Sequence, residues 1–149
     1  MTIALQSWDT VIGGPWRILA GAQETGGQVL VGEARLWPGD PAPGLHVHRN
    51  EDEHVYVIEG SLTVEIGGER TLAHAGEFVT LPKGVPHVFG NLSDEPVRCL
   101  GIIAPVGIEG FFRAQERYFA ELDGPPDPAR LAEIAAPFGI ELMGPPLTR

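Results

Sequence analysis

The feature that most restricts the fold is a succession of short apolar segments separated by turns that contain glycine or proline. The segments follow one another from residue 16 to residue 104 and are rich in β-branched and aromatic side chains, which favour strands. The chain has 20 glycines and 14 prolines in 149 residues, and both residue types favour tight turns. We expect strands at residues 29–36, 54–59, 62–66, 69–73, 78–81, 86–90 and 97–104. This pattern predicts an all-β sandwich or barrel.

One hairpin is indicated with particular clarity, because only Gly67 and Gly68 separate the segments 62–66 and 69–73. Both glycines can adopt the positive φ angles that a type I′ turn requires. We therefore expect two antiparallel neighbours joined by a two-residue turn.

The C-terminal third differs from the rest because its apolar residues recur at helical spacing, which predicts a helix over residues 108–122. The recurring residues are Ile108, Phe111, Phe112, Phe119 and Leu122. A second helix is expected at 128–138, since Asp127 is a suitable N-cap, Pro128 suits the first helical position and Gly139 follows the end. Both helices should pack on the outside of the β-domain or against a second subunit.

These patterns predict one domain. Residues 1–107 would form the β-barrel, and residues 108–149 would form a helical extension of the same domain.

Three histidines and one glutamate are spaced so that strand geometry can bring them together. His46 and His48 are two residues apart and would face the same side of a strand. Glu53 lies at an odd offset from His48, but the polar residues 49–52 favour a turn, so Glu53 can enter the same cavity from the next strand. His87 begins another expected strand after a turn that contains proline and glycine. We therefore predict a four-ligand site.

Three imidazoles and one carboxylate suit a single borderline divalent transition metal, namely iron, manganese, nickel, copper or zinc. An octahedral ion would keep two positions free for water, oxygen or substrate. Phe89 is two residues beyond His87 and shares its inward face, so we assign it a substrate contact. Trp16 and Trp37 are further candidates for an aromatic pocket.

The residues around these ligands form two spaced motifs, which resemble the paired motifs of the cupin superfamily over residues 39–91. The stretches 43–53 and 56–60 are similar to the single-domain, quercetin-dioxygenase-like branch. The resemblance implies a double-stranded β-helix, or jelly-roll, barrel with a metal inside. It also implies a homodimer. By this resemblance His46, His48, Glu53 and His87 are the metal ligands.

The leading functional hypothesis is a metal-dependent dioxygenase that acts on an aromatic or flavonol-like small molecule. Glu53 would ligate the metal and, on partial release, accept the substrate hydroxyl proton as general base. A second hypothesis is a non-redox isomerase, lyase or decarboxylase, which a pocket lined with arginine and lysine would favour. A third is a non-catalytic protein that binds a small molecule or the metal itself.

The net charge of -10 argues against binding to nucleic acid or to an anionic membrane surface. The sequence has no signal-peptide pattern and no run of 18 apolar residues, so we expect a cytoplasmic protein. Cys99 is the single cysteine and is expected to be a buried, inert thiol.

Other polar residues near the motifs have simpler interpretations. His54 should face the opposite side of its strand from Glu53, as an exposed or interface residue, and His74 should lie on the surface. Glu51 and Asp52 are expected in a solvated turn. Ordinary helix-to-sheet packing is the expected role of Phe111 and Phe112.

Overall fold

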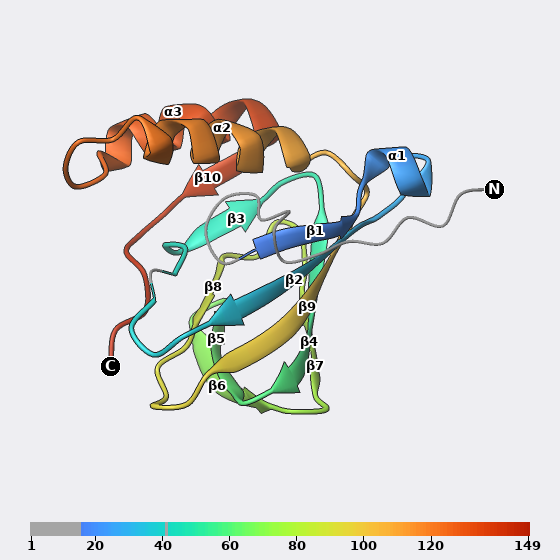
Figure 1. Ribbon diagram of the computed structural model, residues 1–149, viewed down its shortest axis with the longest axis vertical. Coiled ribbons are helices and arrows are strands. Elements are labelled where there is room, and N and C mark those ends of the chain that lie inside the picture. Colours follow the sequence, from blue (N-terminus) through green and yellow to red (C-terminus); the bar gives the residue numbers. More distant parts are fainter. Residues whose placement is uncertain (1–15, 41) are drawn as a thin grey trace.

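Two five-stranded antiparallel sheets face each other in the computed structural model, which describes residues 16–40 and 42–149 (Figure 1). The first sheet has the strand order β1 (Trp16–Ala20), β2 (Leu30–Leu36), β9 (Val97–Ala104), β4 (Asp52–Glu59) and β7 (Phe78–Leu81). The second has the order β10 (Ile140–Leu142), β3 (His46–His48), β8 (His87–Gly90), β5 (Ser61–Ile66) and β6 (Glu69–His74). This arrangement confirms the all-β jelly-roll prediction.

The predicted hairpin is present between β5 and β6. Ile66 pairs with Glu69, and the two intervening glycines have φ angles of 58° at Gly67 and 88° at Gly68. The positive φ angles are those of a type I′ turn, as the glycine pair predicted.

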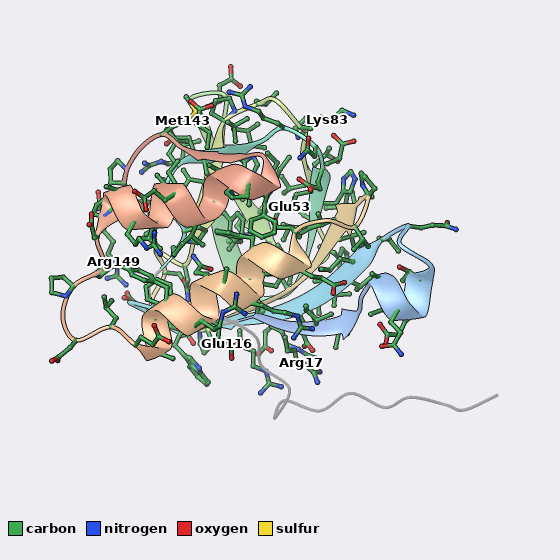
Figure 2. The ribbon with its side chains drawn as sticks, turned by 90° about the horizontal axis from the view of Figure 1, so that it is seen from above. Arg17, Glu53, Lys83, Glu116, Met143 and Arg149 are labelled. Carbon is green, nitrogen blue, oxygen red and sulfur yellow. The ribbon has the colours of Figure 1, made fainter. Side chains whose placement is uncertain are left out.

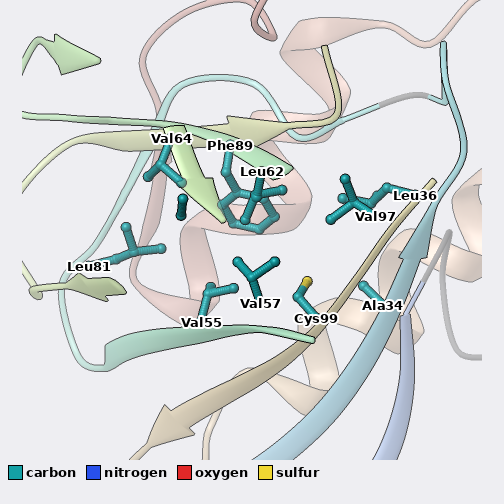
Figure 3. Close-up of a cluster of buried hydrophobic side chains, with 11 residues drawn as sticks. Ala34, Leu36, Val55, Val57, Leu62, Val64, Leu81, Phe89, Val97 and Cys99 are labelled. Atoms are coloured by element: carbon teal, nitrogen blue, oxygen red, sulfur yellow. The ribbon is translucent and has the colours of Figure 1, made fainter. Parts of the chain in front are cut away.

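The main core lies between the two sheets and is built by strand alternation. Val55 and Val57 of β4 face inward from one sheet, and Val64 of β5 and Phe89 of β8 face them from the other (Figure 3). Cys99 of β9 lies in the same cluster with no exposed surface, and burial raises the pKa of its thiol to about 12. The thiol is therefore protonated and inert, as predicted.

The C-terminal third forms the two predicted helices, α2 (Glu109–Ala120) and α3 (Pro128–Ala135), and a short 3-10 helix, η1 (Ala136–Phe138), continues α3. Another short helix, α1 (Ala22–Thr25), follows β1. The Ala129 N–H donates to the Asp127 carboxylate at 2.9 Å, which is the expected N-cap. Helices α2 and α3 lie side by side over β10 (Figure 1).

The two helices close one end of the barrel with a second hydrophobic cluster, which we call the apolar cap. Its buried residues are Leu30, Ile103, Ile108, Ala135 and Ile140, and its partly buried residues are Ile18, Val106, Phe111, Phe112, Phe138 and Leu142. Phe111 and Phe112 thus take part in helix-to-sheet packing, as expected.

Strand β10 is a feature that the sequence analysis does not predict. Its residues pair with β3 in the register Ile140 to His48, Glu141 to Val47 and Leu142 to His46. A three-residue strand is too short to display an alternating pattern, so tertiary pairing rather than local propensity defines it.

A charged cluster on the outer face of the first sheet is also absent from the sequence analysis. Glu33 of β2 is 2% exposed and accepts hydrogen bonds from Arg17 of β1, at 2.6 Å from Nη2, and from Arg98 of β9. Burial raises the pKa of the Glu33 carboxyl, but the two guanidinium groups outweigh it and hold the pKa below its usual value. Glu33 therefore ties three strands together.

Within residues 16–40 and 42–149, none of the helices combines the length and the apolar character needed to cross a bilayer.

Candidate metal centre

The structure brings together all four residues that the motifs single out. His46 and His48 lie on β3, Glu53 on β4 and His87 on β8, and all four side chains are buried. One donor atom from each residue lies within 4.8 Å of the others. This grouping can hold one metal ion.

The alternation of side chains along a strand, together with one turn, explains why the four residues meet. His46 and His48 project from the same face of β3, and His46 is directly opposite His87 in the pairing of β3 with β8. The chain reverses after His48, so Glu53 reaches the site from β4 in the facing sheet. In the view from above, Glu53 is seen in the gap between the ribbons of α2 and α3 (Figure 2). The ligands therefore meet between the two sheets, at the helical end of the barrel.

Nitrogen and oxygen donors crowd the centre of the group. The Nε2 atoms of His46 and His48 are 3.1 Å apart. Glu53 Oε2 lies 3.5 Å from His48 Nε2 and 3.4 Å from His87 Nε2. Such short separations place three imidazole nitrogens and one carboxylate oxygen around a common point.

In His46 and His87, the ring nitrogen that points away from the centre faces a backbone carbonyl oxygen. This contact identifies Nδ1 as the protonated nitrogen of both neutral rings. His46 Nδ1 donates to the Gly44 carbonyl oxygen at 2.7 Å, and His87 Nδ1 donates to the Val85 carbonyl oxygen at 3.0 Å. In the neutral rings the Nε2 lone pairs must then point into the centre. His87 Nε2 is buried there without a hydrogen-bond partner among the described residues. Converging lone pairs fit a bound cation, so the residues fit a metal ion.

Burial also sets the charge of these groups. It lowers the pKa of His48 to about 4, and it also lowers the pKa of His46. For Glu53, burial raises the pKa, but the surrounding imidazoles outweigh it and hold the pKa below its usual value. At neutral pH these lowered pKa values leave His46 and His48 neutral and Glu53 ionised, which are the forms that bind metals.

The expectation that Glu51 lies in a solvated turn is wrong. Glu51 is 3% exposed, and its Oε2 lies 3.6 Å from His48 Nδ1. Burial raises the pKa of this carboxyl. Asp52 is half-buried in β4 and accepts a hydrogen bond from the Lys83 backbone N–H at 2.9 Å. A run of four polar residues resembles an exposed loop, and only the folded barrel shows that one of them turns inward.

The aromatic candidates separate into buried and exposed residues. Phe89 is 3% exposed in the main core and packs edge-on against Trp16, with ring centroids 6.3 Å apart. Trp37 is 57% exposed, outside the core. Phe89 shares the inner face of β8 with His87, and its contact with a substrate stays a prediction.

The remaining histidines lie apart from the four-residue group. His54 is half-buried, its Nδ1 is 3.1 Å from the Thr80 hydroxyl, and its ring stacks on Phe78. His74 is exposed, with Nδ1 2.9 Å from the Ser61 hydroxyl. Both positions agree with the sequence analysis.

Apart from Glu51, which lies behind His48, the residues paired with the four metal-binding candidates across the strands are apolar. Directly opposed residues of antiparallel strands point to the same face of the sheet, so strand pairing identifies these inward neighbours. Leu142 opposes His46, Ile140 opposes His48, Leu81 and Ile103 oppose Glu53, and Ile66 opposes His87. We call these five residues the apolar ring. No lysine or arginine of the described residues is buried, so no cationic side chain faces the candidate centre from the interior.

Fold and site together define a jelly-roll barrel with a 3-His, 1-Glu candidate metal centre. The family profile of the cupin domain matches residues 32–103, just under half of the chain, and over these residues the barrel is similar to the cupin domain.

Known proteins support this assignment over parts of the chain. It is 39% identical over 51 residues to a quercetin 2,3-dioxygenase of Bacillus subtilis (strain 168), covering 34% of this chain and 15% of that protein. It is 32% identical over 77 residues to the polyketide synthase protein CurC of Streptomyces cyaneus, covering 52% of this chain and 49% of the relative. The chain thus spans half or less of the length of these two relatives.

Among solved structures, a protein from Klebsiella pneumoniae with a double-stranded β-helix domain superimposes with a TM-score of 0.58. The match covers 70% of this chain and 92% of that protein at 21% identity, which supports the fold alone.

Proposed function

We propose that this cupin is a metal-dependent dioxygenase that acts on an aromatic, hydroxylated small molecule of flavonol or polyketide type. The observation that carries the proposal is the apolar ring around an intact set of four metal-binding candidates. A polar or phosphorylated substrate would need a cationic partner near the centre, and no buried lysine or arginine is available among the described residues. The names of the two curated relatives point to the same substrate classes.

The four residues would hold a divalent transition metal, which supplies positions for the substrate oxygen and dioxygen and, when redox-active, electrons. The protein itself positions the metal-binding side chains and the substrate, and it excludes water. His46, His48 and His87 are 0 to 7% exposed and are fixed by the surrounding strands. The apolar ring contacts the carbon skeleton of the substrate and keeps water away from the centre.

Glu53 has a second role in this proposal. It is the single carboxylate of the four-residue group, and its Oε2 lies within 3.5 Å of two imidazoles. On partial release from the metal, its oxygen would accept the proton of the substrate hydroxyl.

The test is oxygen uptake by protein that is stripped with a chelator and reloaded in turn with iron, manganese, nickel, copper or zinc. Quercetin and a hydroxylated polyketide-type aromatic compound serve as probes. We expect uptake with at least one redox-active metal, and none with the His46→Ala variant loaded identically.

Two outcomes contradict the oxygenase proposal. Turnover of a probe that persists without oxygen would instead indicate a non-redox cupin enzyme. Saturable binding of a probe without product, for all five metals, would indicate a binding protein. Either result leaves metal binding itself intact, because metal content is measured separately by elemental analysis.

A further inference from the structure

The three imidazoles of the candidate centre are not supported in the same way from behind. His46 and His87 each donate from Nδ1 to the backbone carbonyl two residues earlier, at 2.7 and 3.0 Å. His48 Nδ1 has no hydrogen-bond partner among the described residues. The group that faces it is the carboxylate of Glu51, with Oε2 at 3.6 Å.

The carboxylate oxygen lacks a partner as well. Three buried side-chain polar atoms of the described residues have no hydrogen bond, and they are His48 Nδ1, Glu51 Oε2 and His87 Nε2. The first two face each other, and the third points into the centre. Both side chains of the facing pair are 3% exposed, so bulk solvent does not reach them. A small approach of Glu51 and His48 would satisfy both atoms, and a buried polar atom without a partner is costly.

We propose that Glu51 is a positioning residue of the metal centre, which accepts the Nδ1–H of His48 and thereby fixes the tautomer and direction of that ring. This inference rests on the metal binding proposed above, but not on the oxygenase reaction. A cation at Nε2 withdraws electron density from the imidazole and makes Nδ1–H a stronger donor to a carboxylate. Glu51 is outside the group of four whose donor atoms converge, so it acts through His48 and not as a ligand.

The backbone at Gly107 lies close to the other oxygen of the Glu51 carboxylate. A Cβ atom added at Gly107 would lie 2.9 Å from Glu51 Oε1, closer than side chains normally approach. The carboxylate therefore lies between the His48 ring and the backbone that leads into α2. Because the end of a glutamate side chain moves easily, Gly107→Ala should displace Glu51 and leave all four ligands unchanged.

The test measures Co²⁺ affinity of the full chain by competition with a chelator, together with the visible absorption spectrum of bound Co²⁺. We expect Glu51→Ala to weaken affinity roughly 10- to 100-fold and to change the spectrum, as loss of a carboxylate behind a ligating histidine does. Glu51→Gln keeps a carbonyl acceptor and should lose less. Gly107→Ala should weaken affinity even though it removes no polar group.

Glu141→Ala is the matched control. Glu141 is exposed on β10, opposite Val47, where it forms an ion pair with Arg49. Its replacement removes the same charge near the same strand but leaves His48 untouched, so Co²⁺ affinity and spectrum should stay at wild-type values. Thermal unfolding of each metal-free variant shows whether the fold is retained. If Glu51→Ala does not fold, Glu51→Gln and Gly107→Ala carry the test.

Wild-type affinity and spectrum in the folded Glu51 and Gly107 variants would overturn the inference and leave the metal proposal standing. An equal loss in Glu141→Ala would also overturn it, since bulk charge would then explain the effect. Absence of Co²⁺ binding by the wild-type chain would overturn the metal proposal itself, and this inference with it.

Discussion

Ile140 and His48 face each other across the pairing of β10 with β3, so the strand that carries two candidate ligands is supported by a strand from the C-terminal third. On its other side β3 pairs with β8 at one position, His46 with His87. Ile140 is 3% exposed and belongs both to the apolar ring and to the apolar cap. The position of His48 therefore depends on β10.

Replacement of Ile140 should consequently damage both stability and the metal site. Ile140→Ala leaves a cavity beside His48, and we expect a loss of about 2–4 kcal/mol in the free energy of unfolding. Urea denaturation and metal titration measure the two effects. Glu141→Ala, on the outward face of the same strand, should change neither by a measurable amount. Similar losses in both variants would contradict the assigned facing of β10.

Metal binding should stabilise the protein by mass action. At a free metal concentration one hundred times the dissociation constant, the gain is about 2.7 kcal/mol, which corresponds to a rise in Tm of roughly 5–10 °C for a chain of this size. Differential scanning calorimetry before and after chelation measures it. His46→Ala should lose most of the shift, and a shift that persists in this variant would place the metal elsewhere.

The metal-free protein should become less stable as the pH falls from 7 to 4. The pKa of His48 is about 4 in the folded chain against 6.5 for an unperturbed histidine. Between these values the unfolded chain binds more protons, so stability that is present above pH 6.5 is lost on acidification. His48 should contribute roughly 3 kcal/mol, at about 1.4 kcal/mol per pKa unit.

Chemical denaturation at several pH values measures this dependence. His48→Gln should flatten it but not abolish it, because burial lowers the pKa of His46 in the same direction. An unchanged pH dependence in the variant would show that His48 titrates normally in the folded state.

Glu33 should matter for stability and not for metal binding. Glu33→Gln leaves Arg17 and Arg98 without their carboxylate, and because the Arg98 side chain is 39% exposed, water compensates part of the loss. We expect a decrease of about 2 kcal/mol in the free energy of unfolding, below the range for a fully buried pair. Glu65→Gln breaks the more exposed pair with Arg70 and should cost about 0.5 kcal/mol. Equal costs would contradict the importance of burial here.

Replacement of the turn glycine Gly60 should destabilise the fold more than replacement of the turn glycine Gly68. The φ of Gly60 is 79°, and an added Cβ would collide with the Pro96 carbonyl oxygen. Gly60→Ala should cost about 3 kcal/mol, since left-handed strain and a backbone clash add together. Gly68 has a φ of 88° but open space around it, so Gly68→Ala should cost about 1 kcal/mol. Urea midpoints of the two variants separate the clash from the strain.

The sequence predicted features that depend on short-range periodicity and spacing. Short segments rich in β-branched and aromatic residues located β4 and β9, and the glycine pair located the β5–β6 turn. The two-residue spacing of His46 and His48 placed them on one face of a strand. The missed features depend on partners distant in the chain. Glu51 is buried because the barrel closes around it, and Glu33 because two arginines from other strands cover it.

The pairing of β10 with β3 also bears on the order in which the protein matures. All four candidate ligands leave the ribosome well before Ile140, yet β3 acquires its longer pairing only when β10 arrives. A nascent chain that ends after β9 would present the ligands on a strand held at a single position. Metal capture is thus expected to follow synthesis of the C-terminal third, so translation itself would delay loading until the barrel can hold the ion.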